Sequence, residues 1–275
     1  MKRTRALWPF YLLMAMTVLE AQAGTITAAH YSMPVSRYGH FALGQPHEYA
    51  RLNATLDSGP PLSLRLPENE VFEDLAPRLV QLTPEGPTEL LAIVSRREDG
   101  ARLVLIRPRG DQLEIRAETP AIGTPMRWLN PVGVADLDSD GAAEIAVITT
   151  PHIGGTLRVY RPQGTQLVEI AALDGFSNHI LGSPELGLSL PLSIAGKTRL
   201  IVPDTTRRHL RIVGLEAGRL IEIGRCALPA PVSGAIRALN NTEISVELSS
   251  GRHTIALDPC LDKPRPTALR TGPLP

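Results

Sequence analysis

The sequence predicts an all-β fold, a β-propeller of about five blades in which three- to four-stranded antiparallel sheets surround a central channel. Three observations support this prediction. Sequence markers recur with a regular period of roughly 50 residues, and each recurring unit contains several short apolar runs. The 275 residues also include 23 glycines and 25 prolines, which disfavour long helices and favour short strands joined by turns. Hydrophobic residues make up 43% of the chain, so a substantial core can form.

Two independent sets of residues share the repeat period. Gly110, Gly164 and Gly218 are evenly spaced, and each precedes an apolar segment. The second set is also evenly spaced, at an interval one position longer, and consists of Leu82, Leu137 and Leu192 together with Gly86, Gly141 and Gly196. A period near 50 residues is typical of propellers and of solenoids. A β-solenoid is therefore the structural alternative, although its repeats are usually shorter.

Short strands are expected throughout each unit. The predicted strands are residues 89–94, 102–106 and 113–116 in the first unit; 132–137, 144–148, 157–160 and 167–170 in the second; 200–202, 210–213 and 220–223 in the third; and 243–248 and 253–257 in a shorter fourth. The strands that begin at residues 89 and 144 are apolar at successive positions, as expected for strands covered on both faces. The later strands alternate between apolar and polar residues.

Five blades is the expected number, because the 252 residues that follow residue 23 correspond to about 4.7 units. Residues 39–70 form either a degenerate blade or the strands that close the ring. Closure would cover the apolar faces and open edges that isolated sheets expose. We therefore expect one propeller domain over residues 24–260 and a proline-rich flexible tail over residues 261–275.

The first 23 residues are predicted to be a signal peptide. Lys2, Arg3 and Arg5 precede an apolar run over residues 6–19, and Ala21 and Ala23 are small residues at the positions a signal peptidase accepts. The predicted location is periplasmic or secreted. A retained signal anchor is the alternative, but the run is shorter than the ~20 residues that cross a bilayer comfortably. No later segment approaches that length, so no membrane span is expected after cleavage.

The charge balance argues against two classes of partner. Without the leader the chain has 25 basic and 27 acidic residues. Nucleic acid and anionic membranes both require a concentrated basic surface, which this balance does not provide. The expected partner is instead an unknown protein or small-molecule ligand, and the protein is expected to be a monomer.

Only two cysteines are present, Cys226 and Cys260. An oxidising compartment would allow one disulfide between them. Two free thiols are the alternative, because the sequence does not determine the distance between their Cβ atoms.

One acidic segment predicts a metal site. Asp136, Asp138 and Asp140 occupy alternate positions, Gly141 permits a sharp turn, and Glu144 follows. With the carbonyl of Ala142, these groups can surround one hard cation with oxygen atoms, as Ca²⁺ requires. Val147 stands where an EF-hand needs its bidentate glutamate, so a loop between two strands is favoured over a helix-loop-helix site. An acidic turn without metal is the alternative.

The other units have lost this acidic pattern. Gln81, Thr83 and Glu85 stand at the corresponding positions of the preceding unit, and Pro191, Ser193 and Ala195 stand there in the following unit. Arg199 replaces Glu144. The sequence therefore predicts a single structural Ca²⁺ ion rather than an array.

Residues 134–148 resemble the repeat of the FG-GAP and VCBS families, whose integrin-α-like propellers carry a calcium loop between the first two strands of a blade. The resemblance implies Asp136, Asp138, Asp140 and Glu144 as side-chain ligands and Ala142 as a carbonyl ligand. The chain departs from the family in using glutamate where integrin repeats commonly have aspartate. Segments 37–44, 71–77, 127–133 and 178–179 also resemble an exported proteobacterial branch of VCBS-repeat proteins for which no activity is established.

The propeller prediction places several polar segments at one mouth of the channel, because corresponding positions of successive blades lie around one axis. The candidate ligand-binding residues there are Glu73, Asp74, Arg127, Trp128, His152, Asn178 and His179, with Arg37, Tyr38 and His40 nearby. In the alternative interpretation these residues are structural: Trp128 packs between blades, Glu73 pairs with Arg127, and His179 binds a buried carbonyl group.

The overall prediction is an exported calcium-binding propeller that acts as a ligand- or protein-binding or scaffolding module. A hydrolase that uses the channel mouth is the alternative. It requires a titratable pair among Glu73, Asp74, His152 and His179 within ~3.2 Å in a cleft. A binding module requires instead an apolar or aromatic surface without such a pair.

Overall fold

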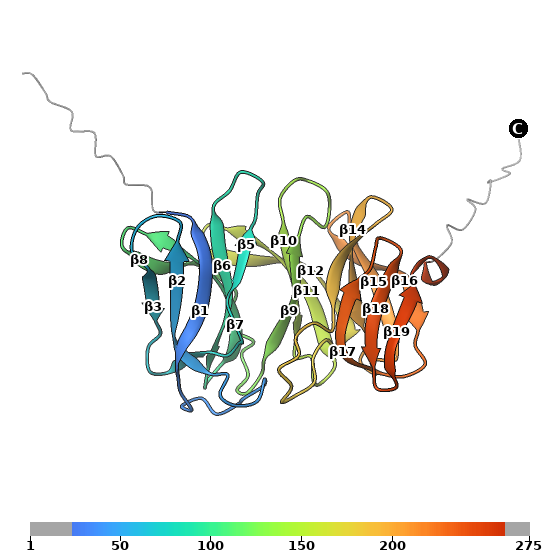
Figure 1. The fold of residues 1–275 in the computed structure, drawn as a ribbon, viewed down its shortest axis with the longest axis horizontal. Coiled ribbons are helices and arrows are strands. Elements are labelled where there is room, and N and C mark those ends of the chain that lie inside the picture. The colour runs from blue at the N-terminus through green and yellow to red at the C-terminus, as the bar shows by residue number, and fades with distance from the viewer. Residues whose placement is uncertain (1–23, 262–275) are drawn as a thin grey trace, which may run out of the picture.

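Short antiparallel strands form nearly all of the regular structure (Figure 1). The computed structural model describes residues 24–261, so the predicted signal peptide and all but the first residue of the predicted tail lie outside the described residues. One 3₁₀ helix, η1 (Asp258–Cys260), follows the last strand. Within residues 24–261 no helix has the length and apolar character needed to cross a membrane. The all-β prediction is confirmed.

The strands fall into five consecutive antiparallel groups. The first contains β1 (Ile26–Pro34), β2 (Tyr49–Leu56) and β3 (Leu62–Arg65). The second contains β5 (Arg78–Gln81), β6 (Thr88–Arg96), β7 (Gly100–Arg109) and β8 (Gln112–Glu118). The third contains β9 (Leu129–Ala135), β10 (Glu144–Thr149), β11 (Gly155–Gln163) and β12 (Gln166–Phe176). The fourth contains β13 (Leu190–Ile194), β14 (Lys197–Pro203), β15 (His209–Glu216) and β16 (Arg219–Ala227), and the fifth contains β17 (Val232–Ala238), β18 (Glu243–Leu248) and β19 (Gly251–Ala256).

Sparse hydrogen bonding joins the first three groups into one 12-stranded sheet. The short strand β4 (Glu70–Phe72) pairs with both β2 and β6. A single parallel pair between Glu118 of β8 and Gln166 of β12 links the second and third groups. The fourth and fifth groups are separate sheets.

The repeat markers lie in the tight turns of these groups. Gly110, Gly164 and Gly218 occupy the turns between the third and fourth strands, with φ values of 62°, 59° and 73°. Left-handed φ values favour glycine, because a side chain there crowds the backbone. The period of the sequence repeat therefore records the recurrence of one hairpin.

Hydrophobic side chains form four clusters, one between each pair of successive groups. Strand β6 shows how this arises. Leu90, Ala92 and Val94 face the first group, whereas Leu91 and Ile93 face the third. Successive side chains of a strand point to opposite faces, so an unbroken apolar run contributes to two cores. The expectation that this strand is covered on both faces is confirmed.

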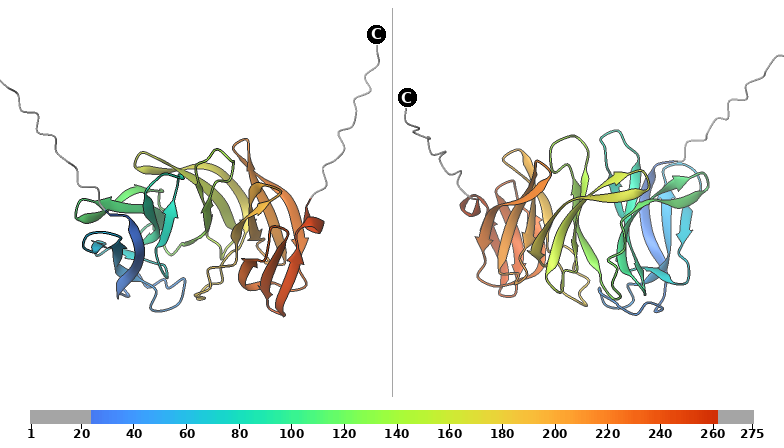
Figure 2. Two further views of the ribbon diagram at one scale, coloured as in Figure 1. Left: turned by 45° about the horizontal axis from the view of Figure 1, so that its top comes forward. Right: turned by 180° about the vertical axis from the view of Figure 1, so that it is seen from behind.

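The two terminal groups have one polar face each, and the sheets are not closed into a ring. On β2 the residues between the buried ones are Arg51, Asn53 and Thr55, and on β18 they are Glu243, Ser245 and Glu247. The described residues contain no fifth cluster between the first and fifth groups. Figure 2 (left) shows the groups on an arc whose ends stand apart. The expectation that closure must cover apolar faces was wrong, since polar outer faces cap a stack without a further blade.

Cys226 on β16 and Cys260 in η1 form a disulfide that ties the end of the chain to the fourth group. This is one of the two alternatives left open by the sequence.

Replacing both cysteines by serine is expected to lower the free energy of unfolding by about 2–4 kcal/mol, because the bridge closes a loop with a sequence separation of 34. Urea denaturation of the double variant and of the parent, each with and without reductant, measures this difference. A parent whose transition midpoint is insensitive to reductant would contradict it.

Candidate functional site

The acidic loop joins β9 to β10, and Asp136 organises it. Its carboxylate accepts hydrogen bonds from the backbone N–H groups of Ser139, Asp140 and Gly141 at 2.7, 3.2 and 3.0 Å. Gly141 has a φ of 92°, which allows the chain to turn sharply. The loop therefore has the compact shape that the sequence pattern predicts.

Three of the five predicted ligands converge. One carboxylate oxygen from each of Asp136, Asp138 and Glu144 lies within 4.8 Å of the others. Glu144 is fully buried, and its Oε2 accepts the Leu137 N–H at 2.8 Å. Burial raises the pKa of Glu144. Asp140 lies outside this group and accepts the N–H of Ala142.

Arg161, which sequence reasoning missed, lies among these carboxylates. It projects from β11 and places its guanidinium 2.5 Å from Asp138 Oδ2, 3.0 Å from Asp140 Oδ2 and 2.6 Å from Glu144 Oε1. A buried carboxylate needs a compensating positive charge, and the guanidinium provides one. The loop thus contains its own cation.

The next group carries the same ion pair with the charges exchanged. Arg199 on β14 and Glu216 on β15 are 2.9 Å apart. Their sequence separation of 17 equals that between Glu144 and Arg161. The shared spacing is the sequence signal that could have identified Arg161. The second group departs from this pattern, because its Glu89 pairs with Arg116 of β8, so the pair at this spacing is shared by the third and fourth groups only among residues 24–261.

The carboxylate oxygens of this loop can bind a dication only if the Arg161 guanidinium leaves them. The converging carboxylates are the ligand type that Ca²⁺ takes. The guanidinium of Arg161 lies against two of them, and a cation cannot share that position. The side chain of Arg161 is 31% exposed, so it has a path toward solvent. Metal binding at this loop requires Arg161 to move.

Five of the residues predicted at or near the mouth form a second site, which we call the mouth cluster: His40, Glu73, Trp128, His152 and His179. The Trp128 indole donates a 3.0 Å hydrogen bond to the carbonyl of Glu73. Its ring lies 6.1 Å from that of His152 and 4.7 Å from that of His179. Residues from separated segments therefore meet, as the repeat geometry suggests.

The two histidines share one hydrogen bond, 2.7 Å long, between His152 Nε2 and His179 Nδ1. His179 Nε2 lies 2.8 Å from the Ser183 carbonyl, which can only accept. His179 therefore carries its proton on Nε2, and His152 donates from Nε2. The pKa of both imidazoles is lowered to about 4, chiefly by burial, and the neighbouring His179 contributes to the lowering for His152.

The remaining contacts of the mouth follow the structural interpretation in part. Buried Glu73 pairs with His40 at 2.8 Å and accepts the Ser95 hydroxyl at 2.7 Å. The expected pair between Glu73 and Arg127 is wrong, because Arg127 bonds the carbonyl of Met126 instead.

Three other candidates are also engaged within the fold. Asp74 is buried and pairs with Arg78 at 2.5 Å. Asn178 is fully buried and exchanges amide-to-carbonyl hydrogen bonds with Asn130 at 3.1 and 3.2 Å. Arg37 binds Glu68 and two backbone carbonyls. The nearby Tyr38 packs edge-on against His40. The predicted ligand-binding residues thus hold neighbouring segments together.

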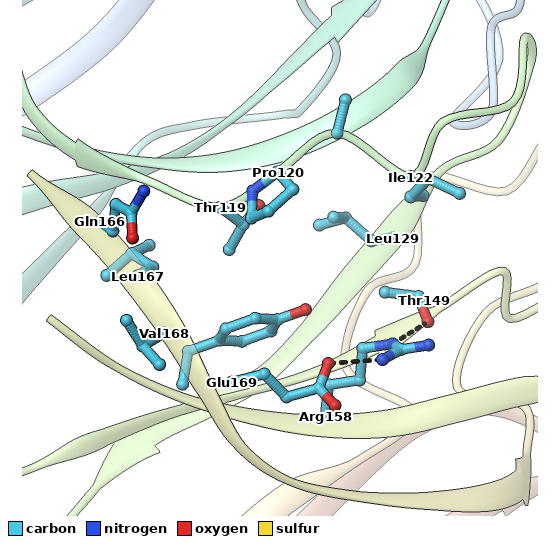
Figure 3. Close-up of a pocket in the computed structure, with 12 residues that line it drawn as sticks. Thr119, Pro120, Ile122, Leu129, Thr149, Arg158, Gln166, Leu167, Val168 and Glu169 are labelled. Carbon is cyan, nitrogen blue, oxygen red and sulfur yellow. Dashed lines mark hydrogen bonds and ion pairs between the residues drawn. The ribbon is translucent and has the colours of Figure 1, made fainter. Parts of the chain in front are cut away.

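The two larger cavities lie away from the mouth cluster. A cavity of about 530 Å³ lies at the junction of the second and third groups (Figure 3), and another of about 580 Å³ borders β5 and β9. We call them the first and second cavities. No residue of the mouth cluster lines either one.

Comparison with known proteins identifies no family. No family model matches the chain, and no curated protein matches it. Among solved structures, the intramolecular trans-sialidase from Ruminococcus gnavus, in complex with oseltamivir carboxylate, is similar with 13% sequence identity and a TM-score of 0.48. The similarity covers 78% of this chain and 51% of that one. The chain therefore spans about half the length of the sialidase chain it matches.

The histidine pair predicts a loss of stability in mild acid. Both imidazoles have a folded-state pKa of about 4, below the ordinary value of 6.5. The unfolded chain therefore binds protons first, and stability is lost as the pH falls from 6.5 to 4. Replacing His152 by Gln should reduce this loss. Because His152 is partly exposed, the expected effect is modest. Between pH 7 and pH 4.5 the melting temperature of His152→Gln should fall by about 3 °C less than that of the parent. His30→Gln, at an exposed position on β1, is the control, and an unchanged slope in His152→Gln would contradict the assignment.

Proposed function

We propose that this protein is an exported β-propeller-type module of five blades that binds a small molecule or a protein, with a calcium-competent loop that holds its third blade. The five strand groups, stacked through four apolar clusters, support the blade count. The predicted signal peptide supports export.

One observation supports the binding role: the polar side chains of the mouth are bonded to partners within the fold, whereas the two large cavities lie elsewhere. Of the groups suited to catalysis at the mouth, Glu73 and His179 are buried and His40 and His152 are half-buried, and all four are bonded to partners within the fold. The two large cavities are lined mainly by apolar side chains, and their charged residues are paired. Binding sites for organic ligands are of this kind, with apolar walls and a few polar groups.

The calcium role is structural. Asp136, Asp138 and Glu144 would hold the ion, with Asp140 and the carbonyl of Ala142 as the further oxygen donors predicted from the sequence. Calcium would supply the positive charge that these carboxylates need, and Arg161 would then release them. Because Glu144 begins β10, its fixation would hold the hairpin between β9 and β10.

A hydrolase remains the second candidate because of one observation. His152 and His179 form a titratable pair at 2.7 Å, which is within the distance that acid–base chemistry requires. Against this candidate, His179 is fully buried and bonded at both ring nitrogens.

Calcium is expected to raise the melting temperature of the parent and to leave Asp138→Ala unmoved. Arg161→Gln removes the guanidinium that competes with calcium. We take this competition to cost calcium binding about 1.4 kcal/mol, so the half-maximal shift of the melting temperature should occur at a roughly tenfold lower calcium concentration in this variant than in the parent. Thermal melting over a calcium series measures all three. Arg158→Gln, on the same strand but paired with Glu169, is the matched control. Equal responses of the parent and Asp138→Ala would refute the calcium site.

The binding role predicts thermal stabilisation by ligands without turnover. A library of uncharged and charged small molecules, screened by melting temperature, should contain compounds that stabilise the parent, since a ligand that binds only the native state raises its stability. The same preparation should hydrolyse p-nitrophenyl esters and glycosides no faster than buffer. Hydrolysis that is lost in His152→Gln would favour the hydrolase, and a library without any stabilising compound would refute the binding module.

A further inference from the structure

The first cavity is lined by the connection between β8 and β9 and by strands β9, β10, β11 and β12, at the junction of two strand groups. The connection between β8 and β9 supplies Pro120, Ala121 and Ile122, and β12 supplies Leu167 and Val168. Figure 3 shows Pro120, Ile122, Leu167 and Val168 around an open space, with Leu129 of β9 beside Ile122. Its volume of about 530 Å³ lies within the range of cavities that hold organic ligands.

Tyr160 is the polar group that points to a ligand. It lines the cavity from β11, is 8% exposed, and its ring belongs to the apolar cluster between the second and third groups. Within residues 24–261 its hydroxyl forms no hydrogen bond, and its oxygen is not sealed from solvent. The residue is thus almost fully buried while its oxygen opens onto the cavity, so the hydroxyl can donate to a molecule bound there.

The hydroxyl is a neutral donor at all physiological pH values. Burial raises the pKa of Tyr160 to about 12. A bound group that accepts a hydrogen bond can therefore rely on the phenolic proton.

The charges of the cavity cancel within the protein. Arg158 donates to Glu169 and, at 3.2 Å, to the hydroxyl of Thr149, as the dashed lines in Figure 3 show. These are the charged residues of the lining. The pair leaves no uncompensated charge in the lining, so an uncharged ligand needs no counter-ion there, whereas a charged ligand would compete with the existing pair.

We propose that the first cavity binds an uncharged, largely apolar molecule of aromatic size that carries one hydrogen-bond acceptor, such as a ketone or amide oxygen, directed at the Tyr160 hydroxyl. The proposal rests on the binding function proposed above and adds its site and ligand class. The second cavity lacks this feature, because no tyrosine lines it.

The probe for the test is 6-propionyl-2-dimethylaminonaphthalene, an uncharged aryl ketone whose emission moves to shorter wavelength in apolar surroundings. Titration with the intact protein should give saturable binding of one molecule. Tyr160→Phe keeps the ring and removes the donor, so the affinity should fall about three- to tenfold. Ala121→Phe fills the cavity and should abolish binding. If Ala121→Phe has a lowered melting temperature, Val168→Arg, at a partly exposed position of the same cavity, is used in its place.

Ala76→Phe, an identical change on the wall of the second cavity, is the matched control and should leave the affinity unchanged. Binding that is indifferent to Tyr160→Phe and Ala121→Phe, or that Ala76→Phe abolishes instead, would overturn the assignment to the first cavity while the binding function stands. An absence of saturable binding by the parent would also overturn it. Whether the protein binds small molecules at all is then decided separately, by the melting-temperature screen of the compound library.

Discussion

The structure depends on strands that are apolar on both faces. In β6 every side chain except the two outermost is buried, in β10 every side chain is buried, and in both strands neighbouring residues enter different clusters. Such a strand is stable only between two other sheets, because a bare face would expose apolar area worth roughly 25 cal/mol per Å². The groups must therefore stack in series. The series ends where one face becomes polar, as it does on β2 and β18. Stacking and termination thus follow from one property of the side chains, and neither requires a closed ring.

Internal neutralisation governs the polar groups in the same way. Glu73, Asp74 and Glu144 are fully buried, and each meets a basic side chain: His40, Arg78 and Arg161 respectively. A buried charge without a partner costs several kcal/mol, so these contacts are a condition of folding. The consequence for function is that the groups best suited to acid–base chemistry are already engaged. The two larger cavities are lined instead by apolar residues together with neutral polar groups and paired charges.

Much of the strand pattern could be predicted, because it depends on local properties. The long runs from residues 89, 144 and 243 and the glycines at 110, 164 and 218 correspond to strands and turns of the structure. Of the missed strands, β3, β4, β5 and β13 have only three to five residues, and β17 mixes glycine and polar residues into its run. Their backbone partners define them as strands, and partners contributed by other segments leave no periodic trace in so few residues. The longer β1 and β2 lie in the N-terminal part of the chain, for which no individual strand was predicted. The open ends were also missed, because the polarity of one sheet face has meaning only once its neighbour is known.

The repeat, the all-β class, the shape of the acidic loop and the residues that meet at the mouth could all be established from the amino-acid sequence, since each follows from spacing along one chain. What those residues do depends on tertiary contacts. The fold places Arg161 of β11 among the carboxylates of the loop and His40 against Glu73. It also leaves the hydroxyl of Tyr160 without a partner beside a cavity, among the residues that the structure describes. The reason is physical: the state of a polar group depends on the charges and donors within a few ångströms of it, and the fold brings those from segments that spacing along the chain does not relate.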